Sequence, residues 1–345
     1  PGLPTFRAAY SPLTRIVSDN ATPELRRLQA ELGARHSFRE AAHLLNKLTP
    51  CARQNHATIR NRLGSVAKAL VEQSVEATAG TGNQSKPPEV TVFLDSAYVR
   101  SRPEYQRRNF EVIVRSIESE TTQKRRFGLS QMGADHPVEH LRSSLKAAGW
   151  EDGVAVTVLS DGDPALPRLV RNATGADVRH ILDWWHISVR IRHVETTFQT
   201  LMSHIETESG AETTALVETL RWRIWHGQTN RALDTLDVLF RFAMRVREYT
   251  YGKLEDAALS VASRAMELRT YLSHNLSAIA NYGRRRKQGK AVSTSRAEGL
   301  VNEIANVRMG KKQRMRWSPR GAHNVAVVRA AVLDERLSPA ILRVA

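Results

Sequence analysis

The chain has 345 residues, 41% of them hydrophobic, so it is long enough for two or three domains with a substantial core. Lysine and arginine number 51 against 35 acidic residues, and the net charge of +16 favours polyanionic partners, nucleic acid first and an anionic membrane surface second. The single cysteine, Cys51, excludes internal disulfides and multi-cysteine zinc sites, and no apolar stretch approaches the roughly 20 residues of a membrane span.

Residues 1–80 are expected to form a helical region. Ser37 and Glu40 have the spacing of a capping box, in which each side chain bonds the free backbone N–H of the other, and an amphipathic run follows them. A second short amphipathic run carries Arg60 and Arg62 on its polar face. The two runs suit either a helix-turn-helix module that contacts DNA or a small helical bundle with a solvated basic face.

Residues 81–88 have the composition of a linker, and a strand-rich pattern follows them. The order βββαβαβ in one mixed sheet is that of an RNase H-like α/β domain, although other α/β folds share alternating crossovers. The expected elements are strands at 89–99, 110–120 and 124–132, a helix at 137–148, a strand at 154–160, a helix at 164–173 and a strand at 177–183.

Between residues 186 and 292 the strand pattern disappears, and Leu, Ala, Arg and Glu recur at helical spacing. We interpret this segment as an all-helical insertion in a catalytic domain made of residues 89–185 and 293–337. Near the end of the insertion, the run from Arg284 to Lys290 is expected to form an exposed basic loop. No internal repeat is evident.

Three acidic residues occupy positions that suit metal binding. Asp95 and Asp161 each end an apolar run, and Glu298 lies at the start of a helical pattern. Oxygen ligands suit Mg²⁺ or Mn²⁺, and a pair of such ions activates a nucleophile and neutralises the leaving oxygen in phosphodiester chemistry. An acidic trio in a basic chain therefore predicts two metal ions acting on a phosphate backbone.

Each acid also has a structural explanation. An Asp at the end of a strand often forms a turn, and Asp163 is the alternative ligand because it shares the turn with Asp161. Glu298 fits the third position of a capping box begun by Ser295. Asn302, one turn further along the same helical face, is an accessory candidate.

Several segments resemble those of bacterial insertion-sequence transposases of the DDE class, and residues 308–323 are similar to the Kra-type group of these elements. The resemblance covers residues from about 35 to 337. It implies that the three acids bind two Mg²⁺ ions and that a helical insertion separates the second Asp from the Glu. The segments are VFLDS at 92–96, LSDGD at 159–163, ILDWWH at 181–186 and SRAEGLVN at 295–302.

The resemblance also draws attention to a pair and a tryptophan. Asp183 and His186 match a family motif, and their spacing places them on one helical face. Further zinc ligands are missing from this motif, so it either fixes the join between sheet and insertion or orients the scissile DNA. Trp225 falls where related transposases have an insertion-domain tryptophan, and it either packs in the core or stacks on an unpaired base.

Basic clusters are expected to hold DNA phosphates without reading sequence. They follow the first strand and the catalytic helix, and others lie in the N-terminal region and the insertion. The expected DNA-binding residues are Arg60, Arg62, Arg100, Arg102, Trp225, Arg285, Lys311, Lys312, Arg314 and Arg316.

The resemblance implies a transposase that binds the terminal inverted repeats of its own element, cleaves DNA and joins the 3′-OH to target DNA by transesterification. Two alternatives stay open: an RNase H-like nuclease or resolvase without strand transfer, and a truncated remnant that only binds DNA. Pairing of two DNA ends implies at least a homodimer. Without a signal peptide or membrane segment, we expect a cytoplasmic protein associated with the bacterial nucleoid, and the first residue, Pro1, favours a fragment.

Overall fold

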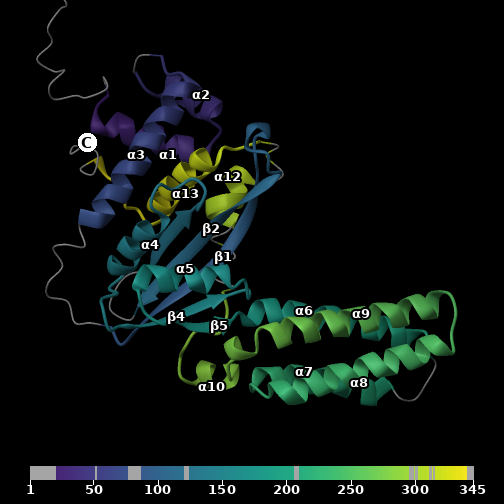
Figure 1. The fold of residues 1–345 in the computed structure, drawn as a ribbon. Helices are drawn as coiled ribbons and strands as arrows, with labels where there is room; N and C mark the ends of the chain where they lie inside the picture. The colour runs from purple at the N-terminus through teal and green to yellow at the C-terminus, as the bar shows by residue number, and fades with distance from the viewer. Residues whose placement is uncertain are drawn as a thin grey trace, which may run out of the picture.

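The computed structural model describes residues 21–50, 53–76, 87–119, 124–205, 210–294, 299, 302–310, 313 and 315–339. Figure 1 shows three regions: N-terminal helices, a sheet with helices on both faces, and a helical bundle that projects from one end of the sheet. Among the helices of the described residues, none combines the length and apolarity that spanning a bilayer requires.

The N-terminal region consists of α1 (Pro23–Arg35), α2 (Phe38–Leu48) and α3 (His56–Glu76). The predicted cap of α2 is confirmed, because the Ser37 side chain accepts a hydrogen bond from the Glu40 backbone N–H at 3.2 Å. The prediction of two short helices is wrong for α3, which is 21 residues long. Its apolar face continues past the predicted run because it packs on α1 and on α13 (Pro319–Leu333).

The sheet has five strands in the order β3-β2-β1-β4-β5. The first three strands along the chain pair antiparallel, whereas β1, β4 and β5 pair parallel, so the predicted α/β class with a mixed sheet is confirmed. β-branched runs produce these strands, since such side chains pack well on a pleated surface. The strands are β1 (Glu89–Arg100), β2 (Asn109–Ser119), β3 (Arg125–Leu129), β4 (Ala155–Ser160) and β5 (Arg179–Leu182).

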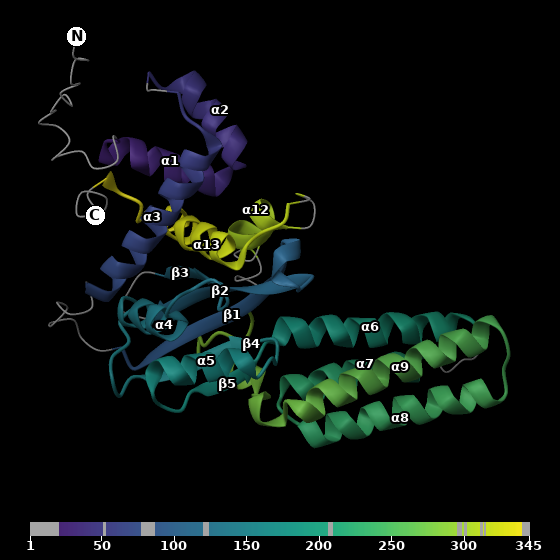
Figure 2. The same ribbon diagram turned by 45° about the horizontal axis from the view of Figure 1, so that its top comes forward.

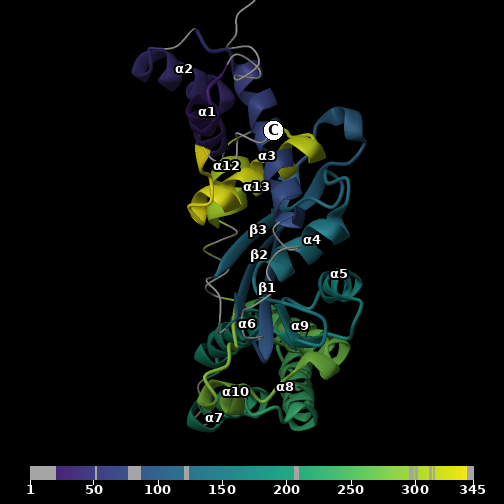
Figure 3. The same cartoon turned by 90° about the vertical axis from the view of Figure 1, so that its left-hand side faces the viewer.

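Helices cover both faces of the sheet. On one face, α4 (Pro137–Lys146) and α5 (Ala165–Thr174) enclose a core that includes Leu94 and Ile113. The other face packs on α13, and its core continues into the N-terminal helices and the bundle. Figure 3 shows the sheet in the middle of an elongated molecule, between these two helical regions. Short elements complete this part of the fold: η4 (Pro103–Tyr105), the π-helix η6 (Asn302–Asn306) and α12 (Val307–Met309).

The bundle follows β5 directly and returns the chain to the sheet (Figure 2). Asp183 caps its first helix by accepting a hydrogen bond from the Trp185 backbone N–H at 2.9 Å. Its helices are α6 (Trp184–Ser203), α7 (Gly210–Trp225), α8 (Thr229–Glu248) and α9 (Lys253–His274), and η5 (Leu276–Ala278) and α10 (Tyr282–Lys287) follow them.

The predicted basic loop at 284–290 is wrong in part, since most of it forms α10. The Asn281 side chain caps this helix by accepting a hydrogen bond from the Arg284 N–H at 2.8 Å. Arg285, an expected DNA contact, is only 4% exposed, and its Nε donates to the Ala291 carbonyl at 3.1 Å. Its side chain is therefore packed against the chain that follows α10 and is not on the surface, where a phosphate contact was expected.

Candidate acidic site

Asp95 lies inside its strand and not at the strand's end, although the apolar run that predicts the strand stops there. β1 continues to Arg100 because its second half stays paired with β2, in which Val114 lies opposite Asp95. The pairing with β4, however, stops at Phe93. Asp95 therefore lies in mid-strand, just past the point at which the parallel neighbour ends, and its carboxylate accepts the Ser96 backbone N–H at 2.7 Å.

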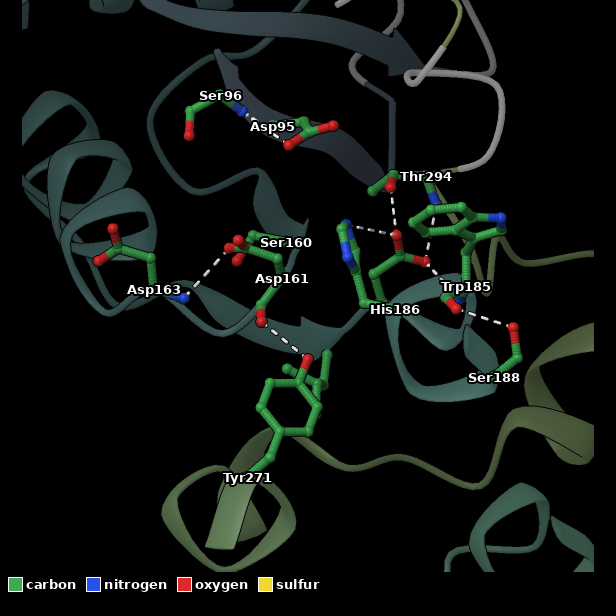
Figure 4. A network of polar contacts seen from close by, with 12 residues as sticks. Asp95, Ser96, Ser160, Asp161, Asp163, Trp185, His186, Ser188, Tyr271 and Thr294 are labelled. Atoms are coloured by element: carbon green, nitrogen blue, oxygen red, sulfur yellow. Dashed lines mark hydrogen bonds and ion pairs between the residues drawn. The ribbon is translucent and has the colours of Figure 1, made fainter. Parts of the chain in front are cut away.

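Asp161 lies at the matching position of the neighbouring strand. Phe93 and Leu159 are the last partners in the parallel register of β1 and β4, and the two acids each follow them by two positions. Because side chains alternate along a strand, Asp95 continues the face of the sheet that carries Phe93, and Asp161 comes directly after the last residue of β4. Figure 4 shows them on adjacent strands, so residues 66 positions apart in sequence occupy one edge.

The choice between Asp161 and Asp163 depends on their hydrogen bonds. The Asp163 carboxylate accepts the Ala165 N–H at 2.8 Å and so forms an Asx turn just before α5. Figure 4 shows this carboxylate turned away from Asp95. The Asp161 carboxylate accepts the Asp163 N–H at 3.2 Å and lies half-buried on the side of Asp95. The geometry thus favours Asp161 over Asp163 as a ligand.

The third predicted acid, Glu298, lies outside the described residues. Across the part of the chain that the structure describes, no three His, Cys, Asp or Glu side chains are grouped in a way that would bind a metal ion. The structure therefore brings together two members of the predicted trio. The accessory candidate Asn302 is exposed at the first position of η6.

Glu111 is an acid near this edge that the sequence analysis missed. It lies on β2 opposite Tyr98, and its Oε1 is buried without a hydrogen-bond partner among the described residues. Burial raises the pKa of its carboxyl group, the negative charges of Asp163 and Asp161 add to this rise, and a hydrogen bond from Ser96 opposes it. An acidic side chain within the apolar run of β2 was the only signal in the sequence.

The donor atoms at this edge fit a hard divalent cation. Asp95 and Asp161 offer only carboxylate oxygens, which Mg²⁺ and Mn²⁺ prefer over nitrogen or sulfur. The orphaned Oε1 of Glu111 adds buried negative charge nearby that a cation would offset. The residues present are therefore compatible with the expected ions, and Glu298 is the expected further ligand.

Asp183 and His186 form a structural joint. The Asp183 carboxylate is fully buried and accepts hydrogen bonds from the Trp185 N–H, the Thr294 N–H at 2.9 Å and the Thr294 hydroxyl (Figure 4). His186 Nε2 lies 3.7 Å from the same carboxylate. Asp183 thus binds the start of α6, the first helix of the bundle, to the segment by which the chain returns from the bundle.

Trp225 packs inside an aromatic cluster. Its ring centroid lies 4.7 Å from that of Trp184 and 6.0 Å from that of Tyr282. Of the two tryptophans in this stretch, Trp222 is the exposed one, at 54%. The packing interpretation of Trp225 agrees with these contacts, and stacking of this ring on a base stays a prediction.

The expected DNA-binding residues have different environments. Arg62 is partly buried and donates to Gln29 Oε1 at 2.7 Å, so it joins α3 to α1. Arg100, Arg102 and Arg316 are exposed. They lie close together, because the Trp317 N–H donates to the Arg100 carbonyl at 2.9 Å and the Arg102 N–H donates to the Trp317 carbonyl at 3.0 Å. Three further candidates lie outside the described residues: Lys311, Lys312 and Arg314.

A groove of about 1250 Å³ lies between α3, α4 and the start of α13, away from Asp95 and Asp161. It exceeds the roughly 300–1,000 Å³ of small-molecule sites, so its size suits a macromolecular segment. Arg60 and Arg102, two expected DNA contacts from different regions, both line it. The other charged residues along it are Lys68, Glu72, Asp135, Glu139 and Arg320.

No protein-family model matches the chain, and no curated protein is similar to it in sequence. Among solved structures, the chain is similar to one described as the Drosophila P element transposase strand transfer complex. The match has 12% identity and a TM-score of 0.43, and it covers 94% of this chain and 98% of that one. This similarity is too low to transfer the function of that protein.

Proposed function

We propose that the chain is a transposase that cleaves DNA and joins the 3′-OH to target DNA. The reaction would take place at an RNase H-like acidic edge, the place just past the parallel pairing of β1 and β4 at which Asp95 and Asp161 lie. The observation that carries this proposal is the matching position of Asp95 and Asp161 on parallel neighbours β1 and β4. The net charge of +16 supports a polyanionic substrate, since a basic chain attracts the phosphates of DNA. The sequence resemblance to insertion-sequence transposases supports the same function.

In the proposed mechanism, Asp95, Asp161 and Glu298 would hold two Mg²⁺ or Mn²⁺ ions. Such ions, when bound, help to activate the attacking oxygen and neutralise charge at the phosphate. The half-buried position of Asp95 and Asp161 limits solvent around the reacting phosphate, which strengthens electrostatic interactions there. Cleavage and strand joining are both displacements at phosphorus, so one set of acids serves both steps.

We place the DNA against the basic residues outside this edge. Arg100, Arg102 and Arg316 would bind phosphates, and the groove that contains Arg60 would extend the contact towards the N-terminal helices. The enzyme would act on the terminal repeats of its own element, as at least a homodimer, in the bacterial cytoplasm. Phosphate contacts of this kind position DNA without selecting a sequence.

The test uses a supercoiled plasmid that carries the DNA flanking the gene for this chain on both sides. We expect the wild-type protein with Mg²⁺ to nick this plasmid and to produce joined strands. Loss of groups that only orient a metal ligand costs about 10–100-fold, so Asp95→Ala should lower cleavage by more than about 100-fold. DNA affinity and the circular dichroism spectrum should change little.

The matched control is Asp177→Ala, because the Asp177 side chain is fully exposed and pairs only at the surface with Arg171, 3.4 Å away. It should cleave like wild type. Cleavage retained by Asp95→Ala would remove the acidic edge from the mechanism. Cleavage without joined products would favour the nuclease alternative, and DNA binding without any cleavage would favour the non-catalytic remnant.

A further inference from the structure

One side chain of the helical insertion bonds the backbone of Asp161. The hydroxyl of Tyr271, near the end of α9, donates a hydrogen bond to the carbonyl oxygen of Asp161 at 2.7 Å (Figure 4). The two residues are 110 positions apart, so this bond joins the bundle to the sheet. It acts on Asp161 itself, the residue that follows β4 directly.

Tyr271 is held in place by other residues of the insertion. The guanidinium of Arg190, on α6, lies 4.2 Å from the centre of the Tyr271 ring, within the range of a cation–π contact. The Asn275 side chain donates to the Tyr271 carbonyl at 2.9 Å. The hydroxyl that reaches Asp161 is thus the end of a restrained side chain.

The turn after Asp161 is shaped to accept this end of α9. Gly162 has φ +99°, a conformation that residues with a side chain rarely adopt. A Cβ atom at this position would lie 2.8 Å from Asn275 Oδ1 and 3.0 Å from Leu182 Cδ1. The absence of a side chain at Gly162 therefore permits close contact between the Asp161 turn and the insertion.

Asp161 is consequently restrained on two sides. Its carboxylate accepts the Asp163 N–H at 3.2 Å, and its carbonyl accepts the Tyr271 hydroxyl. Cation affinity depends on groups that orient a ligand without touching the ion, and loss of such a group typically costs about 10–100-fold in affinity. The Tyr271 hydroxyl acts less directly, because it fixes the main chain from which the Asp161 carboxylate extends, so we expect an effect at the lower end of this range.

We infer that Tyr271 is a positioning residue through which the helical insertion sets the affinity of the acidic edge for divalent cations. This inference rests on the proposed function, because it takes Asp161 as a cation ligand. It assigns the insertion a role in the chemistry in addition to any contact with DNA. If Tyr271 had only a structural role, its hydrogen bond would hold the bundle to the sheet as other bonds do, without a particular effect on cation affinity.

Tyr282 offers a matched control. It lies on α10, and its hydroxyl donates to the Leu182 carbonyl at 2.9 Å, so it is a second tyrosine of the insertion that bonds the sheet backbone. Its acceptor is an apolar residue and not a proposed ligand. Tyr271→Phe and Tyr282→Phe each remove one hydroxyl and one hydrogen bond to the sheet.

The experiment measures Mn²⁺ binding to the full chain by electron paramagnetic resonance of the free ion, without DNA. We expect Tyr271→Phe to weaken Mn²⁺ binding about tenfold, equal to about 1.4 kcal/mol, and Tyr282→Phe to leave it within about twofold of wild type. Equal affinities for Tyr271→Phe and wild type would overturn the inference. An equal loss in both tyrosine variants would also overturn it, since the effect would then be general loosening of the bundle.

Two further variants keep the outcomes distinct. Asp161→Asn should abolish the binding that Tyr271→Phe weakens; binding unaffected by Asp161→Asn would contradict the proposed function and not only the inference. Arg190→Met keeps the Tyr271 hydroxyl but removes the cation over its ring, and it serves if Tyr271→Phe does not fold. Weaker Mn²⁺ binding by Arg190→Met supports the inference, and wild-type binding contradicts it.

Discussion

Asp161 and Asp163 are separated by one glycine, yet their carboxylates have different partners. The Asp163 carboxylate bonds the Ala165 N–H in the turn before α5, so Asp163→Ala should lower the free energy of unfolding by about 1 kcal/mol, the value of one hydrogen bond, and leave DNA cleavage intact. Asp161→Asn should instead abolish DNA cleavage and change the free energy of unfolding little. Urea unfolding and plasmid cleavage, measured on both variants, test these two predictions. Loss of cleavage in Asp163→Ala alone would show that the ligand is Asp163.

A second prediction at this scale concerns pH. Burial, aided by the charge of Arg320, lowers the pKa of His323 to about 4, while Asp135 opposes the shift. Between the ordinary value of 6.5 and about 4, the unfolded chain binds a proton at His323 that the folded chain does not. Stability should therefore fall by up to about 3 kcal/mol as pH drops through this window.

Urea unfolding at several pH values between 4 and 7 measures this effect, with His323→Gln as the comparison. The variant should lose less stability than wild type on acidification, because it has no imidazole to protonate. His140, whose ring centroid lies 5.7 Å from that of His323, has a pKa shifted in the same direction, so part of the slope should persist. Parallel curves for the two proteins would exclude His323 as a source.

Single residues were predicted unevenly from sequence. Asp95 and Asp161 stood out because each follows an apolar run. Glu111 was missed because its position near them depends on the antiparallel register of β1 and β2, which no local pattern specifies. Arg285 was predicted as exposed because a basic run is usually solvated, whereas its packing against the Ala291 carbonyl is a tertiary contact.

At the scale of elements, Asp183 joins the start of α6 to Thr294. Asp183→Ala would leave the backbone N–H groups of Trp185 and Thr294 without their acceptor in a buried place. Each lost bond to a charged group costs about 1.5–3 kcal/mol, so we expect a loss of about 3 kcal/mol or more. Thr294→Val removes only the hydroxyl bond and should cost less. Equal losses in urea unfolding would contradict the role of the backbone bonds.

The strands and the α/β class followed from local patterns, since β-branched runs and helical periodicity are strong signals. The expected strand at 89–99 agrees with β1 to within one residue at its end, but the apolar run alone places Asp95 at the end of the strand, which is wrong. β1 extends beyond its apolar run because β2 pairs with it as far as Asn109, and that pairing places Asp95 in mid-strand. The helix at 282–287 was missed because its run of basic residues indicated a loop, and the cap at Asn281 was not recognised.

At the scale of the whole molecule, two buried arginines fasten the N-terminal helices to the sheet region. Arg308 lies between the rings of Phe38 and Trp317, 5.0 Å and 4.8 Å from their centres. Arg329 donates to the Ala34 carbonyl in the last turn of α1 and to the Glu303 carbonyl in η6, both at 2.7 Å. Cations at the end of a helix also interact favourably with its dipole.

Arg329→Met should therefore loosen α1 and η6 together. We expect a loss of about 3 kcal/mol in unfolding free energy, because the buried Ala34 carbonyl and the part-buried Glu303 carbonyl lose a charged donor. Hydrogen exchange followed by mass spectrometry should show faster exchange in both segments. The control is Arg241→Met on α8, since Arg241 is exposed and its Nε bonds only the Asp237 carbonyl of its own helix among the contacts described. Faster exchange in one segment alone would contradict the coupling.

The attachment of the N-terminal helices to the sheet region could not be predicted from the sequence. The bond from Arg329 to Ala34 joins residues 295 positions apart, and a buried arginine is indistinguishable in sequence from one that contacts DNA. The two predicted short helices suited either a helix-turn-helix module or a small helical bundle with a solvated basic face. The structure instead packs α3 on α13 and leaves Arg60 at the groove between them.

The central claim is that Asp95 and Asp161 form a divalent cation site. Anomalous X-ray scattering from crystals grown with Mn²⁺ tests it most directly, because the signal locates each ion without any assumption about activity. We predict at least one Mn²⁺ peak within coordination distance, about 2.0–2.6 Å, of carboxylate oxygens of both residues. Well-ordered Asp95 and Asp161 side chains with no peak between them, at Mn²⁺ concentrations that support DNA cleavage, would contradict the claim.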